Sequence, residues 1–359
     1  EKGQKMSKSK GNVLEPLELI DAHGADAVRF TLCALAGPGR DIKLAKQRIE
    51  GYRAFATKIW NAARFCEMNG IAPKPDFDPA SAKLPLSRWI LDAANAAVAE
   101  ANAALEAFRF DDYASACYRF TWGSFCDWFL EFAKPVLQGP DSAEKEEVKG
   151  AAQHVLGVIL KLLHPVMPFI TEELWHRMGY GAECSLIREA WPEPAAVAGA
   201  AEARAELDWV VRLVSEIRTV RSEMNVAPSI TVPLLLAGAS GESLDRAKRW
   251  EEAIKRLGRA TEIRALEGEA PKGAVQAVVG EAPLMLPPAD VVALAAQRAR
   301  LAKERARAAS EAEKTAAKLA SDVFVSRAPE EIVQEMRERL AAQRTEMARL
   351  DAAIARISA

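Results

Sequence analysis

Hydrophobic positions recur every three or four residues along most of the chain, which is the period of amphipathic α-helices. In the clearest stretch the spacings are 3, 4, 3, 4 and 3, through Ile49, Tyr52, Ala56, Ile59, Ala63 and Cys66. The same pattern predicts further helices over about 15–35 (broken at Gly24), 86–107, 112–133, 143–163 and 203–224. Short breaks rich in proline and glycine separate them. Several amphipathic helices joined by short breaks predict a helical bundle.

Local residue chemistry predicts where some of these helices begin and end. Pro135, with the Gly-Pro-Asp turn at 139–141, is expected to close the helix predicted over 112–133. Thr171 is expected to cap the start of another helix, because Glu172 and Glu173 then fall in its first turn, where the helix dipole favours negative charge.

The pattern changes to short strands between residues 230 and 287. The apolar run at 230–236 reads as a strand, and Pro233 predicts an edge position for it because proline donates no ladder hydrogen bond. A helix near 242–257 and further short strands within 261–287 complete a small α/β subdomain.

Residues 291–359 are poor in glycine and proline and rich in alanine, arginine, glutamate and leucine. Apolar residues at near-heptad spacing on both sides of a break at 321–329 predict two helices that form an antiparallel coiled-coil hairpin. The chain as a whole is therefore expected to be mainly α.

Composition narrows the function classes. No stretch approaches the length of apolar residues that a membrane span needs, so no membrane partner is expected. The 48 basic and 50 acidic residues give a net charge of −2, so any nucleic-acid surface must be a local patch. The five cysteines and four histidines show no metal-binding or disulfide spacing, which fits a reducing, cytoplasmic setting and predicts no protein-bound metal.

The strongest chemical motif is Lys5-Met6-Ser7-Lys8-Ser9, with glycines on either side. A solvated basic loop is the usual meaning of paired lysines, but a match to a five-residue string is rare by chance. Such a loop can bend around a polyphosphate and place ammonium groups where negative charge redistributes during transfer at phosphorus.

This string, followed by the Gly-Asn-Val and GADAVRFTL segments, resembles the second signature of class I aminoacyl-tRNA synthetases. Within that class the match is to the bacterial valyl-tRNA synthetase family, which the strings at 39–44, 50–65, 110–135, 164–175 and 217–229 also resemble. The signature loop and the 164–175 string are shared with the isoleucyl and leucyl enzymes, so such a relative stays an alternative.

The resemblance implies an ATP-dependent ligase that activates valine and transfers it to the tRNA for valine. It implies that Lys5 and Lys8 are catalytic, that Lys5, Ser7, Lys8 and Ser9 bind ATP, and that Mg²⁺ accompanies the ATP phosphates. The resemblance also implies a monomer. The first signature of the class, of H-x-G-H type, does not occur, and the chain does not begin with Met. We therefore expect a C-terminal portion that does not catalyse aminoacylation alone.

With the resemblance, the domain order is expected to be the signature loop and end of a Rossmann-type catalytic domain (1–43), an anticodon-binding helical bundle (44–200), a helix with the α/β subdomain (201–290), and a coiled-coil tRNA-binding arm (291–359). A stand-alone tRNA-binding module is the alternative of a different class. A structural helical protein with an accidental loop match is the third reading.

Two features bear on tRNA contact. The aromatic stripe at 112–133 is a base-stacking platform or, more often, bundle core. The first arm of the hairpin, 294–320, carries seven basic and three acidic residues, a net charge of +4, whereas 321–359 carries six basic and seven acidic residues. That run is either a solvated helix face or an arm resting on the tRNA backbone. The candidate tRNA contacts are Arg40, Arg218, Arg221, Arg298, Arg300, Lys303 and Arg307.

Overall fold

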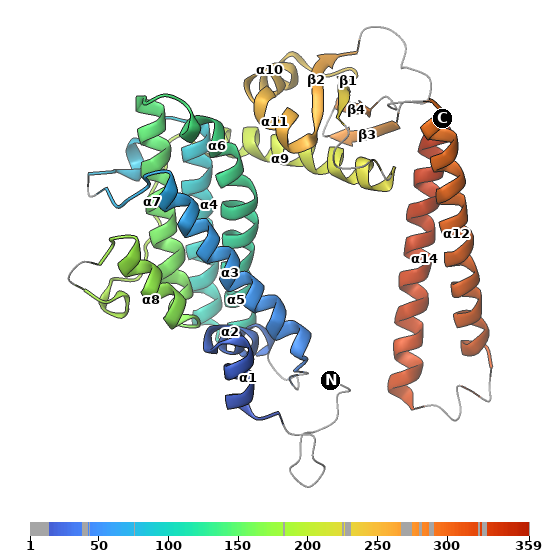
Figure 1. Ribbon diagram of the computed structural model, residues 1–359, viewed down its shortest axis with the longest axis horizontal. Helices are drawn as coiled ribbons and strands as arrows, with labels where there is room; N and C mark the ends of the chain where they lie inside the picture. The colour runs from blue at the N-terminus through green and yellow to red at the C-terminus, as the bar shows by residue number, and fades with distance from the viewer. Residues whose placement is uncertain are drawn as a thin grey trace. The chain divides into compact units, whose positions relative to one another are not determined.

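The computed structural model describes residues 14–37, 42, 44–74, 76–181, 184–224, 226, 231–266, 275–279, 282–286, 291–321, 324 and 329–358. The chain divides into two compact units, residues 1–207 and 208–359, and each is described by itself. Most described residues are helical, so the mainly α fold is confirmed (Figure 1). Within the described part of the chain, no helix combines the length and apolar character needed to cross a membrane.

The first unit opens with two short helices, α1 (Pro16–His23) and α2 (Ala25–Leu35). Gly24 breaks them apart with a φ of +89°, a conformation that glycine adopts readily. α2 buries Phe30 completely, and its ring lies 4.8 Å from that of Tyr52 and 5.3 Å from that of Phe55 on the next helix. This apolar contact fixes α2 on the bundle.

The predicted helical bundle follows, and its helices lie side by side in Figure 1. It comprises α3 (Lys46–Met68), α4 (Pro85–Glu106), α5 (Phe110–Tyr118), α6 (Leu130–Gln138), α7 (Ala143–Leu163) and α8 (Pro168–Arg177). Short 3₁₀ segments, η2 (Pro79–Ser81) and η4 (Leu186–Arg188), lie in the connections. α3 buries the apolar stripe that the spacing predicted, including Ile49, Ile59, Ala63 and Cys66.

The helix predicted over 112–133 is continuous, but its helical type changes along its length. Between α5 and α6 the backbone forms a π-helix, η3 (Arg119–Phe129). The expected closure of this helix at the Gly-Pro-Asp turn is confirmed, because α6 ends at Gln138. The expected role of Pro135 in ending it is wrong, because the proline lies inside α6. Leu137, beyond the proline, is only 4% exposed, so packing holds the last turn despite the missing N–H.

The expected capping role of Thr171 is also wrong. α8 begins at Pro168, which suits a first helical position because proline has no N–H to leave unpaired. Thr171 is buried in the first turn, and its hydroxyl donates to the carbonyl of Met167 at 2.8 Å.

α9 (Ala200–Glu223) begins in the first unit and runs into the second. The second unit contains a sheet of strands β1 (Val232–Leu236), β2 (Ala260–Ala265), β3 (Val275–Val279) and β4 (Ala282–Leu286), in the order β2-β1-β4-β3. β1 is parallel to β2 and antiparallel to β4, and β3 is antiparallel to β4. α10 (Gly241–Arg249) and α11 (Glu251–Gly258) connect β1 to β2.

The expected edge position of Pro233 is wrong, because β1 lies between β2 and β4. The pairing register with β2 shifts between Val232 and Leu234, so the proline falls at an irregularity of the ladder. An irregular position spares the sheet a missing donor, which is how a proline enters an interior strand.

The predicted antiparallel hairpin is confirmed as α12 (Val291–Leu319) and α14 (Glu330–Ser358). Leu301, Ala312, Val333, Leu350 and Ala353 are buried. Across the two helices the Arg305 Nε donates to Asp351 Oδ1 at 2.9 Å. An ion pair of 2.5 Å between Arg356 and Glu223 links the end of α14 to α9.

Two helical glycines predict opposite effects on stability. A Cβ on Gly150 of α7 would lie 2.2 Å from the ring of Phe77, whereas a Cβ on Gly51 of α3 meets nothing within 4 Å. Gly51→Ala is therefore expected to raise the free energy of unfolding by about 1 kcal/mol through helix propensity. Gly150→Ala is expected to lower it by about 1–3 kcal/mol through overpacking. Urea unfolding of both variants measures the difference, and equal gains would contradict the seating of Phe77 on α7.

Candidate nucleic-acid interface

The signature-loop residues Lys5, Ser7, Lys8 and Ser9 lie outside the described residues, as does Arg40. Arg298 and Arg300 lie in α12, but their side chains are not among those that the structure describes. The structure therefore places the side chains of four predicted tRNA contacts: Arg218, Arg221, Lys303 and Arg307.

On the hairpin, Lys303 and Arg307 are both exposed and stand one helical turn apart. Arg307 contacts Glu311 of its own helix at 3.2 Å. Arg305, between them in sequence, is turned toward α14 and pairs with Asp351. Lys303 and Arg307 thus form part of an outward face, while Arg305 is engaged with the other arm.

The two arginines of α9 differ in exposure. Arg218 is exposed, and its Nε donates to the carbonyl of Leu257 at 3.1 Å. Arg221 is only 6% exposed, and burial together with the neighbouring charge of Arg259 lowers its pKa. Arg221 therefore offers little surface for a phosphate.

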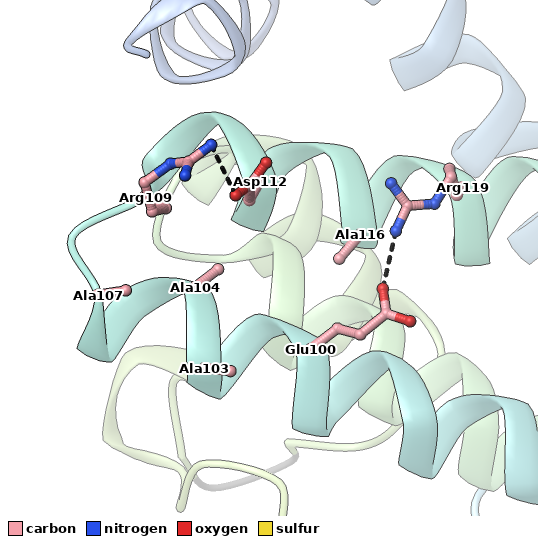
Figure 2. A pocket seen from close by; sticks show the side chains of 8 residues that line it. All are labelled: Glu100, Ala103, Ala104, Ala107, Arg109, Asp112, Ala116 and Arg119. Atoms are coloured by element: carbon pink, nitrogen blue, oxygen red, sulfur yellow. Dashed lines mark hydrogen bonds and ion pairs between the residues drawn. The ribbon is translucent and has the colours of Figure 1, made fainter. Parts of the chain in front are cut away.

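The described residues also contain a site that sequence reasoning missed. α4 and α5 approach each other at the C-terminal end of α4 and leave a groove of about 420 Å³. Figure 2 shows its lining: Glu100, Ala103, Ala104, Ala107, Arg109, Asp112, Ala116 and Arg119. Four of the eight lining residues are alanines, and the other four are charged.

The charged groups form two ion pairs (Figure 2). Arg119 Nη2 lies 2.8 Å from Glu100 Oε2, and Arg109 Nη2 lies 2.9 Å from Asp112 Oδ2. The side chains of both pairs are about half exposed. Exposed ion pairs of this kind contribute little to stability, so a bound ligand can replace one partner at small cost.

Phe108 lies in the turn that joins α4 to α5. It is 77% exposed and has a φ of +56°, which bulky residues rarely adopt. Its chain neighbours Ala107 and Arg109 line the groove. An exposed aromatic residue with a strained backbone is a feature that folding stability alone does not favour.

This arrangement suits an unpaired nucleobase better than a phosphate. Arginine donors and carboxylate acceptors match the edges of bases, and an exposed ring offers a stacking surface. The groove itself carries as many carboxylates as guanidinium groups, so a bare anion gains little there.

The aromatic stripe at 112–133 is mainly core, as the more common of the two interpretations predicted. Tyr113, Phe125 and Phe129 are each at most 2% exposed. Trp122 is half-buried and stacks on Tyr118 at 5.6 Å between ring centroids. The Lys58 ammonium lies 5.3 Å from the Trp122 ring and 2.8 Å from Asp127, so it is already engaged.

All five cysteines are free thiols. Burial raises the pKa of Cys66, Cys117 and Cys126 to about 12, so these thiols are packed groups without nucleophilic character at neutral pH. Among the described residues, no group of three or more His, Cys, Asp and Glu side chains is placed to hold a metal ion.

Comparisons with known proteins divide the chain into three matched regions. Residues 1–45 match the family model for class I tRNA synthetases (I, L, M and V). Residues 87–236 match the anticodon-binding domain of tRNA ligase, which includes the groove. Residues 293–358 match the valyl tRNA synthetase tRNA binding arm, which is the hairpin.

Curated relatives match over essentially the whole chain. The valine–tRNA ligase of Granulibacter bethesdensis is 56% identical over 99% of this chain, and that of Gluconobacter oxydans is 52% identical over 100%. The chain spans 40% of the length of each of these relatives. Among solved structures, the ternary complex of Agrobacterium radiobacter K84 agnB2 LeuRS-tRNA-LeuAMS covers 74% of this chain and 31% of its own at 18% identity, with a TM-score of 0.44.

The backbone strain at Phe108 predicts the effect of its substitution on stability. Asparagine tolerates positive φ, so Phe108→Asn is expected to leave the free energy of unfolding unchanged or to raise it by up to about 1 kcal/mol. Met68→Gln, at a site equally exposed but distant in sequence, is the control, and no gain is expected there. Urea unfolding of the purified chain measures both, and a marked loss for Phe108→Asn alone would contradict the strain.

Proposed function

Because the chain belongs to the valine–tRNA ligase family of class I aminoacyl-tRNA synthetases, we propose that it is part of an enzyme that activates valine with ATP and joins it to its tRNA. The observation that carries this proposal is the identity of 56% and 52% to valine–tRNA ligases over essentially the whole chain. The hairpin supports the valyl member of the class, because the matching arm model is that of valyl tRNA synthetase.

We assign the ATP chemistry to the signature loop, with Lys5 and Lys8 as the catalytic residues. Lys8 and Lys5 place positive charge on the phosphates as valine attacks the α-phosphate and pyrophosphate leaves, which stabilises the transition state. Ser7 and Ser9 complete the ATP-binding segment. Mg²⁺ enters with the ATP phosphates as part of the substrate.

We assign the unpaired bases of the tRNA anticodon loop to the α4–α5 groove. The groove lies within the region that matches the anticodon-binding domain, and its chemistry suits base edges. In this assignment Phe108 stacks on a base while Arg109 and Arg119 donate to base acceptors.

We assign the tRNA backbone to the outward face of α12. The first arm carries the net charge of +4, and Lys303 and Arg307 are exposed on it.

Free cysteine thiols support a reducing compartment, and we therefore place the protein in the cytoplasm.

The first test of this function addresses Lys8. In the complete enzyme that carries this chain, Lys8→Ala is expected to slow valine-dependent ATP–pyrophosphate exchange by about 10²–10³-fold, because it removes a positive charge placed for the transition state. Lys10→Ala removes a neighbouring lysine outside the five-residue string and is the matched control. An unchanged rate for Lys8→Ala would overturn its catalytic role, and exchange that depends on isoleucine or leucine in place of valine would overturn the substrate.

The second test addresses the hairpin. Reversal of charge at Lys303 and Arg307 is expected to weaken tRNA binding and to make the slope of log K against log salt shallower by about 0.7–0.9 for each phosphate that the arm no longer neutralises. Reversal at Arg337 and Arg344, which are equally exposed on α14, removes the same number of positive charges and is the control. If neither double variant changes the tRNA affinity or the salt slope of the parent protein, the hairpin is a solvated structure and not a tRNA arm.

A further inference from the structure

Two segments far apart in the sequence meet at the junction between α2 and the turn that leads from α7 into α8. Asp26 lies in the first turn of α2 and is 9% exposed, and Arg29 lies one turn further along the same helix. Their hydrogen-bond partners are backbone groups between residues 165 and 170. Asp26 and its partner Phe169 are 143 residues apart in the sequence. Figure 1 shows α1 and α2 at one end of the bundle.

Asp26 accepts hydrogen bonds from two backbone N–H groups that the start of α8 would otherwise leave unpaired. Its Oδ1 accepts from the backbone N of Phe169 at 3.2 Å and its Oδ2 from that of Ile170 at 2.7 Å. Pro168 has no N–H, and the N–H of Thr171 already reaches the carbonyl of Met167. The carboxylate thus completes the first turn of a helix to which it does not belong.

Arg29 holds the other side of the same turn. Its Nε donates to the carbonyl of Val166 at 3.1 Å and its Nη2 donates to the carbonyl of Pro165 at 2.9 Å. These carbonyls directly follow the C-terminus of α7, where a cation is favoured, just as an anion is favoured at the N-terminus of α8. The two side chains therefore fix the turn in both position and direction.

A side-chain contact also spans the turn. His164 and Thr171 contact each other at 2.8 Å between Nδ1 and Oγ1. Because the Thr171 hydroxyl donates to Met167, its oxygen is left to accept from His164. Burial lowers the pKa of His164, which disfavours its charged form.

We propose that Asp26 and Arg29 are positioning residues, a junction clamp that transmits the orientation of the tRNA-binding bundle to the region that carries the ATP loop. α1 and α2 lie in the region that matches class I tRNA synthetases, while α8 lies in the region that matches the anticodon-binding domain. The bundle holds the anticodon end of a tRNA whose other end must reach the reacting valyl group. A small error of angle at the junction becomes a large displacement at that end, so the clamp serves the tRNA-dependent step and not valine activation.

This inference rests on the proposed function, and three measurements on the complete enzyme test it. They are valine-dependent ATP–pyrophosphate exchange without tRNA, binding of an anticodon stem-loop RNA, and single-turnover transfer of valine from preformed adenylate to whole tRNA. Asp26→Ala and Arg29→Ala are expected to slow transfer by about 10–100-fold, since misplacement far from the chemistry costs that much. Exchange and stem-loop affinity are expected to change less than about twofold, because each uses one side of the junction only.

Graded and control variants separate positioning from general stability. Asp26→Asn keeps one acceptor oxygen and is expected to fall between Ala and the parent protein. Asp21→Ala and Arg48→Ala remove exposed charges from the neighbouring helices α1 and α3, and transfer is expected to be unchanged.

The outcomes are distinguishable. Normal transfer in Asp26→Ala overturns the clamp, and so does a parallel fall in all three measurements, which indicates a general loss of folding. If the parent protein shows neither valine-dependent exchange nor stem-loop binding, the proposed function fails, and the clamp proposal fails with it.

Discussion

The spacing of the helices in the first unit depends on the alanine face of α4. Ala94, Ala97, Ala101 and Ala104 are each at most 7% exposed along this helix, which packs against α5, η3 and α7. Because alanine ends at Cβ, the elements that pack on this face can approach the α4 backbone closely and fill the space with their own side chains. Near its C-terminal end the same helix presents Ala103, Ala104 and Ala107 to the groove that we assign to tRNA. One compositional choice therefore contributes to both the core and the groove.

A second constraint is that backbone N–H groups at the start of an element need a partner, and here carboxylates from other elements supply it. Asp26 serves the start of α8, Glu147 accepts from the backbone N of Lys83 and Leu84 just before α4, and Glu172 accepts from that of Leu186. An unsatisfied buried N–H costs about 1–3 kcal/mol, so each carboxylate fixes where its partner segment begins. Glu147 and Glu172 lie within the bundle, whereas Asp26 comes from α2. It therefore connects two regions that match different family models.

The helices were predictable because a period of three to four apolar residues needs only local sequence. The misjudged positions were those where a distant contact decides. Pro135 stays within α6 because Leu137 beyond it is buried, and Thr171 does not cap α8 because Pro168 starts the helix and Asp26 caps it from 143 residues away. Pro233 sits in an interior strand because the register shifts beside it. In these cases tertiary contacts outweigh the local preference of the residue, so the local sequence alone gives the wrong structure.

The signature loop could be found in the sequence, and the groove between α4 and α5 could not. A short string such as Lys5 to Ser9 is readable because its chemistry is contiguous, whereas the groove arises from missing side-chain volume between two helices and leaves no motif. The net charge of the chain, −2, also gave no sign of either site. The first hairpin arm carries a net charge of +4, and the lining of the groove carries equal numbers of positive and negative groups. Counterion release follows phosphate contacts, and discrimination follows contacts to base edges. On the proposed assignment, tRNA affinity that depends on the arm falls with salt, whereas selection among bases by the groove changes little with salt.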